Sequence, residues 1–247
     1  MFENIISFRA NEAYIDSNQD ILPIPAKLNI PEWFKKLQHT VDKKTIKGCM
    51  PFLDSITAGY ILKLPLDYQV KHNVMHEGKR QTGADSPQAF YHGLSPKINL
   101  NLSGYKEFHN SIQLEGSPLV EKNNNLAVHK ILNPWIIKTP PGYSTLFIPP
   151  LNNTDDRFEI ITGIVDTDLF ENEINFPIIF NGYKYESLDT ILPRGTPYVQ
   201  CIPFKRDRWK FEIKKQDEKK YHQSKFFEHK FMLNNYKKRF WQKKSWK

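Results

Sequence analysis

Residues 133–152, NPWIIKTPPGYSTLFIPPLN, are the stretch that most constrains the fold of this chain. Residues 135–137 form a short run of β-branched and aromatic residues, the types that favour a strand. The Pro-Pro-Gly at residues 140–142 then excludes a helix and supplies a turn, because proline has a fixed φ and no amide hydrogen. Residues 146–148 resume the strand, and the prolines at 149–150 end it. The pattern predicts a strand, a sharp turn and a second strand in the middle of the chain.

Alternation of apolar and polar residues predicts further strands on both sides of this segment. They are residues 59–64 with a continuation or hairpin partner over 66–70, and residues 98–102, 159–165, 174–180, 190–192 and 198–204. Pro177 places its strand at a sheet edge or a bulge, since proline cannot donate to a ladder. Asn181-Gly182 predicts a two-residue hairpin. Residues 72–96 are polar and predict an exposed loop or a long hairpin.

The predicted fold is therefore mainly β, with a sandwich or a β-clip or barrel-like domain over residues 45–213. Residues 1–44 form an N-terminal segment with a short helix, and residues 214–247 form a basic, aromatic arm with an amphipathic helix. Helix is expected mainly at 31–38, where a proline stands in the first turn, and at 215–245.

The composition bounds the class of protein. With 39% hydrophobic and 13% aromatic residues, a chain of 247 residues can bury a substantial core and is globular rather than disordered. Its two cysteines, Cys49 and Cys201, cannot build a disulfide framework, so a reducing compartment such as the cytoplasm is expected. The first residues do not resemble a signal peptide, and no apolar run approaches the roughly 18 residues of a membrane span. No membrane partner is expected.

The net charge of +8 is unevenly distributed along the chain. Residues 205–247 hold sixteen Lys or Arg against five Asp or Glu, whereas the first 204 residues hold nineteen against twenty-two. The body is thus mildly acidic and the arm strongly basic. This asymmetry is typical of a solvated helix face that is docked by its aromatic side chains, and it also suits an appendage that contacts an anionic partner.

Lysines in the arm are interleaved with aromatic residues, a composition that suits two kinds of contact. The rings can stack on single-stranded bases while lysines meet phosphates, which would make residues 215–247 a nucleic-acid surface. The rings can also bury against the body or a neighbouring subunit while the lysine heads stay in water. Phe227, Phe231 and residues 233–240 largely share one helix stripe, which favours docking. The expected partner is a second copy or another protein, with nucleic acid as the alternative.

Two motifs, GIVDTD at 163–168 and RGTPYVQ at 194–200, resemble the closing half of the β-clip fold of deoxyuridine triphosphatases and dCTP deaminases. The resemblance covers residues 139–204. The chain departs from that family at its functional positions, because Leu-Phe at 169–170 stands where the family has its nucleobase-binding Tyr. The Pro-Pro-Leu at 149–151 replaces a Ser-Gly phosphate-binding element, and no glycine-rich C-terminal loop is present. The resemblance therefore implies the fold and not the activity.

The chain also resembles a family of tailed-phage and bacterial proteins that carries a domain-of-unknown-function label. The similar motifs are PEWFKKL, TIKGCMPFLDSITAGY, NPWIIKTPPGYSTLF, GIVDTD and GTPYVQCIPFKR. The resemblance spans most of residues 31–247. It implies a viral or bacterial setting, in the cytosol or the virion, and it implies no activity.

Spacing excludes several chemistries. None of the eight histidines is followed two residues later by Asp or Glu, as iron and 2-oxoglutarate oxygenases require. The two cysteines cannot supply the paired ligands of a zinc site, and a cupin metal site lacks one His. The GxSxG, Walker A and GxGxxG motifs are absent. No metal or cofactor is predicted.

His109, Gln113 and Glu115 form the first candidate site. Spacings of four and two residues place them on one face if this stretch is a strand. They would then hold a polar ligand or a single metal ion at the mouth of a barrel, or else form a polar surface in water.

Asp166 and Asp168, which follow a predicted strand, form the second candidate site. Their carboxylates could bind hydroxyl groups or a divalent cation, or cap the turn. Trp135 and Tyr143 could offer a stacking platform for a ligand, or pack in the core.

The incomplete metal and phosphate sites favour a non-enzymatic binding or assembly protein of phage type that uses its arm to hold a partner. The alternative is a small-molecule enzyme, with mononuclear-metal or nucleotide-related chemistry, in a pocket near His109 and Asp166.

Overall fold

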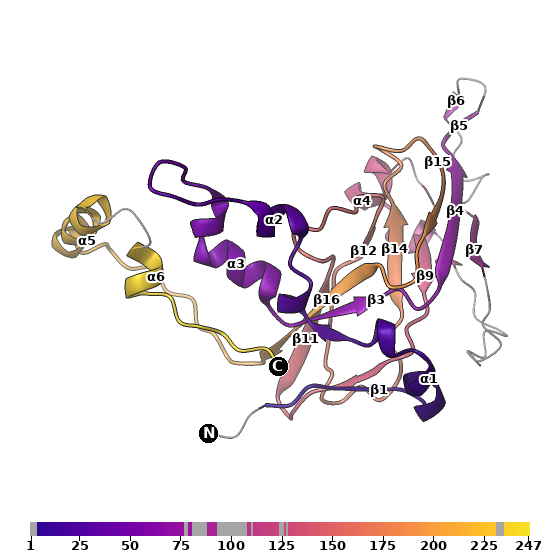
Figure 1. Cartoon of the computed structure of the whole chain (residues 1–247), viewed down its shortest axis with the longest axis horizontal. Helices are drawn as coiled ribbons and strands as arrows, with labels where there is room; N and C mark the ends of the chain where they lie inside the picture. The colour runs from indigo at the N-terminus through magenta and orange to yellow at the C-terminus, as the bar shows by residue number, and fades with distance from the viewer. Residues whose placement is uncertain are drawn as a thin grey trace.

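The computed structural model describes residues 4–76, 79–80, 88–92, 108–109, 111–123, 126, 128–230 and 235–247 (Figure 1). The strands that pair do so antiparallel, and the longest helix lies in the C-terminal arm. The prediction of a mainly β protein is confirmed. None of the described sheets closes on itself into a barrel.

The elements have the following bounds. The strands are β1 (Ser7–Arg9), β2 (Ile24–Pro25), β3 (Tyr60–Lys63), β4 (Asp67–Asn73), β5 (Met75–His76), β6 (Lys79–Arg80), β7 (Gln88–His92), β8 (Phe108–His109), β9 (Val128–Ile131), β10 (Ile136–Lys138), β11 (Tyr143–Ile148), β12 (Phe158–Ile160), β13 (Gly163–Val165), β14 (Phe176–Phe180), β15 (Ser187–Leu192) and β16 (Pro197–Lys205). The α-helices are α1 (Glu12–Ser17), α2 (Glu32–Lys36), α3 (Met50–Thr57), α4 (Pro118–Lys122), α5 (Glu218–Lys230) and α6 (Asn235–Arg239). Short 3-10 helices are η1 (Gln19–Ile21), η2 (Ala26–Leu28), η3 (Ile46–Gly48) and η4 (Ser111–Leu114).

The described strands form five sheets. The three larger ones have the strand orders β13-β11-β16-β3-β2, β12-β14-β9-β8 and β15-β4-β7, and the other two are the pairs β1-β10 and β5-β6. The five-stranded and four-stranded sheets pack face to face through aromatic rings. The ring centroid of Phe147 on β11 lies 5.2 Å from that of Phe176 on β14, and Phe176 lies 5.7 Å from Tyr198 on β16. Because each aromatic side chain removes roughly 150–250 Å² from water, this contact forms the centre of the core.

The strand, turn and strand predicted for residues 133–152 are present as β10 and β11. Gly142 in the turn has a φ of +83°, which glycine reaches without the steric cost of a Cβ. The two strands do not pair with each other, because β10 pairs with β1 and β11 lies between β13 and β16. The turn therefore transfers the chain between two sheets and does not close a hairpin.

Helix α3 corrects the expectation that helix is confined mainly to residues 31–38 and 215–245. Pro51 stands in its first turn, where the missing amide hydrogen costs nothing. Met50 and Ile56 turn inward and are buried. A short apolar stretch does not distinguish a helix from a loop, and packing against the five-stranded sheet decides it here.

Gln200 on β16 holds this helix in place. Its Nε2 donates to the carbonyl oxygens of Ser55 at 2.9 Å and Ala58 at 2.8 Å, acceptors that the end of a helix leaves unpaired. Its Oε1 accepts from the amide of Leu151 at 3.0 Å. One buried side chain thus ties α3 and the loop after β11 to the sheet.

The prediction that Pro177 marks a sheet edge or a bulge is wrong, because β14 lies between β12 and β9. The carbonyl of Pro177 accepts from the amide of Ile161 at 2.8 Å, one residue after β12 ends. In an antiparallel ladder the nitrogen of a residue points to the same side as its carbonyl. The nitrogen of Pro177 therefore points toward the residue that follows β12, so the missing amide hydrogen removes no bond from the ladder between β12 and β14.

The prediction of a two-residue hairpin at Asn181-Gly182 is also wrong. β14 and β15 belong to different sheets, and the amide of Tyr185 closes the connecting turn by donating to the carbonyl of Asn181 at 2.9 Å. A Cβ on Gly182 would lie 2.6 Å from the side chain of Leu126 and 2.8 Å from the carbonyl of Asn123. Close packing therefore explains this glycine.

The remaining strand predictions divide into three groups. Residues 159–165 form two strands, β12 and β13, in different sheets. The predicted β domain extends to residue 213, but residues 209–213 form no strand, so the β body ends at Lys205. Residues 98–102 lie outside the described part of the chain. In the described ranges, no helix has the length and apolar character needed to cross a bilayer.

Candidate functional site

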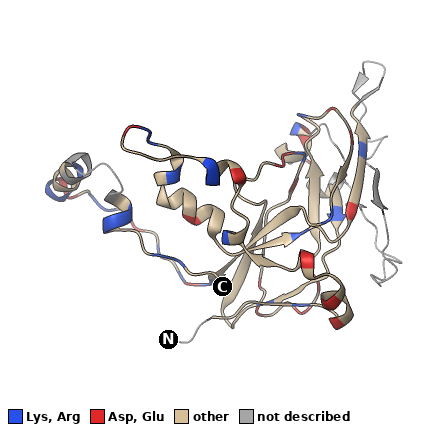
Figure 2. Ribbon diagram, viewed as in Figure 1, with Lys and Arg blue, Asp and Glu red and all other residues tan. Residues whose placement is uncertain are grey.

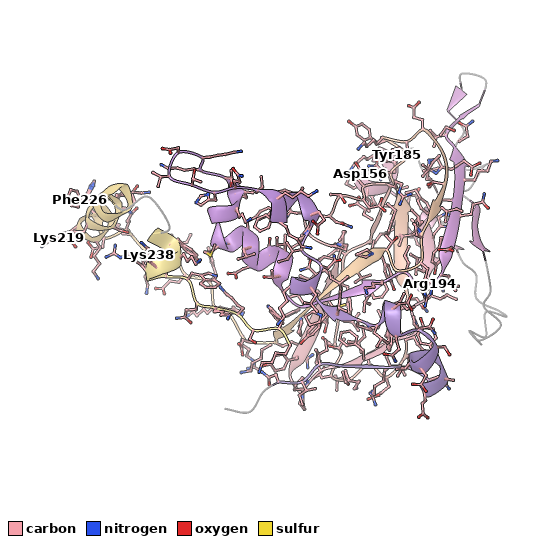
Figure 3. The ribbon with its side chains drawn as sticks, viewed as in Figure 1. Asp156, Tyr185, Arg194, Lys219, Phe226 and Lys238 are labelled. Atoms are coloured by element: carbon pink, nitrogen blue, oxygen red, sulfur yellow. The ribbon has the colours of Figure 1, made fainter. Side chains whose placement is uncertain are left out.

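The C-terminal arm leaves the body earlier than the sequence predicts, and from here on the term denotes residues 206–247. Residues 206–217 have no regular secondary structure, α5 and α6 follow, and the last residues return to the body (Figure 1). Figure 3 shows Lys219, Phe226 and Lys238 on the part of the arm that stands away from the sheets.

The side chains of this outgoing part are in water. Every described side chain from residue 204 to residue 226 is exposed. Three large apolar side chains alternate along it: Trp209 is 91% exposed, Phe211 85% and Ile213 83%. The helix stripe predicted to dock falls largely outside the described side chains, and the described part of α5 does not pack on its own body.

Arg206 and Asp168 hold the base of the arm. The guanidinium of Arg206 donates to both carboxylate oxygens of Asp168, with 2.8 Å between Nη1 and Oδ1. The backbone amide of Arg206 donates to the carbonyl of Gly142 at 2.8 Å, and the amide of Gly142 donates to Asp168 Oδ2 at 2.8 Å. Asp166 completes the cluster, because its Oδ1 accepts from Ser144 Oγ at 2.6 Å and from Arg206 Nη1 at 3.2 Å.

These bonds give the predicted aspartate pair a structural role. Asp166 and Asp168 lie together, as their spacing predicts, but their oxygens already accept hydrogen bonds from Arg206, Ser144 and Gly142. The hydrogen bonds from Arg206, above all, lower the pKa of Asp168 to about 2. The carboxylates fasten the arm to the turn between β10 and β11.

Replacing Arg206 with glutamine is expected to raise the pKa of Asp168 from about 2 toward the ordinary range of a carboxyl group. The sign follows from linkage: a depressed folded-state pKa favours the fold above about pH 4, and this contribution is lost as pH falls through about 2. NMR titration of the Asp168 carboxyl carbon measures it. An unchanged pKa in the variant contradicts the assignment of Arg206 as the cause.

The far end of the arm is docked on the body. Trp241 donates its Nε1 hydrogen to the carboxylate of Asp54 on α3, at 2.9 Å from Oδ2, and Lys244 Nζ lies 2.6 Å from the same oxygen. The ring of Trp246 lies 6.2 Å from that of Tyr60 on β3 in an edge contact. The arm is therefore held at both ends and projects between them.

Charge divides the arm into two parts. Residues 206–230 mix nine Lys or Arg with five Asp or Glu, whereas residues 231–247 hold six Lys or Arg and no acid. Figure 2 shows blue side-chain positions on α6, and red and blue interspersed over the body. The apolar side chains that are exposed near the base thus sit in a segment of mixed charge.

The first candidate site is not assembled as predicted. His109 ends β8 and pairs with Val128, whereas Gln113 lies in η4 and Glu115 follows it. Gln113 and Glu115 are both exposed, and the side chain of His109 lies outside the described ones. The three residues do not lie on one strand, because the chain turns into a 3-10 helix after β8. Within the described residues, no three His, Cys, Asp or Glu side chains converge as metal ligands.

Trp135 and Tyr143 do not form a stacking platform. Trp135 is 3% exposed and packs edge-on against Tyr14, with 5.7 Å between centroids, so it belongs to the core. The hydroxyl of Tyr143 accepts from Asn4 Nδ2 at 2.8 Å. Tyr143 also lines an open groove of ≈ 570 Å³ together with Tyr60 and other residues near both ends of the described chain.

A smaller hollow of ≈ 230 Å³ lies between α4, the loop after β11 and β12. Two of the carboxylates that line it are paired. Asp155 accepts two hydrogen bonds from the guanidinium of Arg157. Asp156 accepts from Lys184 and, at 2.6 Å, from the hydroxyl of Tyr185 (Figure 3). These pairs join the loop to Lys184 and Tyr185, and Lys122 and Glu159 are the other charged residues that line the hollow.

Sequence reasoning missed a buried histidine pair. His72, expected in an exposed loop, lies on β4 and is 4% exposed, and His129 on β9 is 3% exposed. Both rings contact Phe180, at centroid distances of 6.2 and 5.1 Å. Burial lowers the pKa of His129 to about 4 and lowers that of His72. Tyr68, Val70 and His72 are buried at alternate positions of β4, and Val74 just after the strand is buried too; this alternation is the signal that could have located His72.

A scan against protein-family models finds no match for this chain, and a search of curated proteins finds no similar sequence. The two resemblances stated from the sequence therefore stay predictions.

Proposed function

We propose that the chain is a non-enzymatic binding or assembly protein that engages a macromolecular partner through its arm. The exposure of Trp209, Phe211 and Ile213 in one alternating run carries the proposal. Burying one large apolar side chain in an interface contributes roughly 1.5–3 kcal/mol to the free energy of binding. The three side chains together therefore form a substantial binding element. The ion-paired base and the docked end keep this element away from the body that holds it.

The proposed role does not require a catalytic centre. The candidate pair Asp166 and Asp168 is engaged in fastening the arm, and the candidate triad around His109 is not assembled on one strand. The described geometry therefore supports a binding role better than an enzymatic one. The resemblance to tailed-phage and bacterial proteins supports a viral or bacterial setting for the assembly.

Nucleic acid is the second candidate partner, and one observation favours it. All charged residues in the segment 231–247 are Lys or Arg. Tyr236 on α6 and Phe240 just after it are exposed. Lysines with exposed rings bind single strands through phosphate contacts and base stacking. Such binding weakens steeply as salt rises.

Substituting serine at Trp209, Phe211 and Ile213 together is expected to abolish partner binding and leave the fold intact. Because the three side chains are exposed, the free energy of unfolding should change by less than about 0.5 kcal/mol. Sedimentation velocity over a concentration series measures self-association, and anisotropy of a labelled oligothymidine measures nucleic-acid binding. Tyr183→Ser, at an aromatic residue that is 69% exposed elsewhere on the body, is the matched control.

The proposal stands if the wild-type chain and the control bind at least one of these partners and the triple variant loses that binding. It is overturned if none of the three proteins self-associates or binds oligothymidine, or if all three self-associate alike. Equal oligothymidine binding by all three would instead assign the binding to residues 231–247.

A further inference from the structure

The outer face of the five-stranded sheet carries a line of apolar side chains, termed here the apolar row. Leu146 of β11 pairs in register with Ile164 of β13 on one side and with Ile202 of β16 on the other. These side chains point away from the face that buries Phe147, because side chains alternate along a strand. Ile164 is 61% exposed, Leu146 and Ile202 are half-buried, and Phe204 extends the row along β16 at 36% exposure.

Helix α3 covers only part of this face. It lies over Gln200, to which Ser55 and Ala58 are bonded, and it leaves Ile164 and Phe204 exposed. β13 pairs with β11 alone among the described strands, so the row ends at an open sheet edge. Apolar surface at an open edge is where another chain adds to a sheet.

The first part of the arm has the pattern that fits such a face. Trp209, Phe211 and Ile213 alternate with Lys210 and Glu212, so an extended backbone presents the three apolar side chains on one side. Isoleucine has no flat ring to stack on a base, and the intervening charges have both signs. This segment therefore suits a protein surface better than a phosphate backbone.

The arm is directed away from the apolar row of its own chain. The row ends at Phe204, and Arg206 is fixed two residues later by Gly142 and Asp168. For Trp209 to cover Ile202, the chain would have to reverse within three residues, whereas it runs outward from the sheet (Figure 1). The row of a second copy can be reached without this reversal.

The area available fits a reciprocal exchange between two copies. At roughly 150–250 Å² for each large side chain, one arm and the surface it covers bury roughly 1,000 Å². A stable interface buries about 1,200–2,000 Å², so a single arm falls short, and two exchanged arms reach it. Net charge does not oppose the exchange, because the arm as a whole is basic and the first 204 residues hold nineteen Lys or Arg against twenty-two Asp or Glu.

We propose that two copies of this chain exchange arms, with Trp209, Phe211 and Ile213 of each copy seated on the apolar row of the other. The inference rests on the proposed function and names a second copy as the partner. Exchange of identical elements in this way is a low-cost route to a dimer, since each contact is made twice.

Three variants test the exchange by sedimentation equilibrium of the full chain. The arm variant, Trp209→Ser with Phe211→Ser, removes two of the apolar side chains of the arm. The row variant, Ile164→Asp, places a charge in the apolar row, and Tyr183→Ser is the control. Wild type and control are expected to be dimers, and each of the other two should raise the dimer Kd by at least about 30-fold, the loss of one hot-spot side chain. An equimolar mixture of the arm and row variants should associate more tightly than either variant alone and more weakly than the wild-type chain, because the mixed dimer keeps one of the two arm-and-row contacts.

Disulfide cross-linking distinguishes exchange of arms between two copies from an arm that folds back on the apolar row of its own chain. In a Cys49→Ser background, a Phe211→Cys chain mixed with an Ile164→Cys chain should form a disulfide-linked pair under mild oxidation. A disulfide within a single chain that carries both cysteines, formed at high dilution, overturns the exchange. A dimer that survives the arm and row substitutions also overturns it.

Oligothymidine binding by the same proteins separates the two proposals. If the wild-type chain is a monomer and the arm variant loses oligothymidine binding, the exchange is overturned and the proposed function stands with nucleic acid as the partner. If the wild-type chain is a monomer and binds no oligothymidine, both proposals fail. A dimer that the arm and row variants each dissociate, and that their mixture restores in part, supports the exchange.

Discussion

Replacing Gln200 with leucine is expected to lower the free energy of unfolding by about 3 kcal/mol. Gln200 is 1% exposed, and all three of its hydrogen bonds go to backbone groups. Leucine has a similar volume but can neither donate nor accept a hydrogen bond. In the variant the carbonyl oxygens of Ser55 and Ala58 lose this donor, and the amide of Leu151 loses its acceptor. Each unmade bond at a buried site costs roughly 1–3 kcal/mol, and partial access of water at these loops reduces the sum.

Urea unfolding followed by tryptophan fluorescence measures the change. Gln38→Leu is the matched control, because Gln38 is exposed and the substitution should cost less than about 0.5 kcal/mol. A loss below about 1 kcal/mol for Gln200→Leu would show that α3 is held mainly by its apolar contacts. Gln200 also ends the Gly-x-x-x-x-Gln motif of the β-clip resemblance, and in this structure it bonds the protein's own backbone.

Acidification from pH 6.5 toward 4 is expected to lower the free energy of unfolding by about 3 kcal/mol through His129 alone. Burial lowers the folded-state pKa of His129 from 6.5 to about 4. Between these two pH values the imidazole is protonated in the unfolded chain and neutral in the folded chain. The contribution is fully present above the unfolded-state pKa of 6.5 and is lost as pH falls toward 4. His72, whose pKa burial also lowers, acts in the same direction and faces the same ring of Phe180.

Urea unfolding at a series of pH values tests this dependence. The slope of the unfolding free energy against pH between 6.5 and 4 should become shallower in His129→Leu than in the wild-type chain. His222→Leu on α5 is the control, because the side chain of His222 is 76% exposed and its replacement should leave the slope unchanged. Equal slopes in all three proteins would show that His129 is not the group that titrates on unfolding.

Much of the fold could be predicted from sequence because the signals are local. Backbone chemistry alone dictates that residues 140–142 form a turn, and alternation locates β11, β14 and β16. Asp166 and Asp168 lie together for the same reason, since they are two residues apart. Strand pairing is not local, so the hairpin expected at Gly182 proved to be a crossing between sheets, and the strands on either side of the turn at Gly142 lie in different sheets.

The candidate site shows the same division. The sequence by itself determined the mainly β character of the body, the asymmetry of charge and the basic, aromatic composition of the arm, because each depends only on residue order and type. Only the tertiary structure decided that Trp135 is core, that the aspartates fasten the arm, and that Trp209 and Phe211 stay in water. Burial is set by which surfaces meet across the fold. An aromatic side chain carries the same local pattern whether a neighbouring sheet covers it or not.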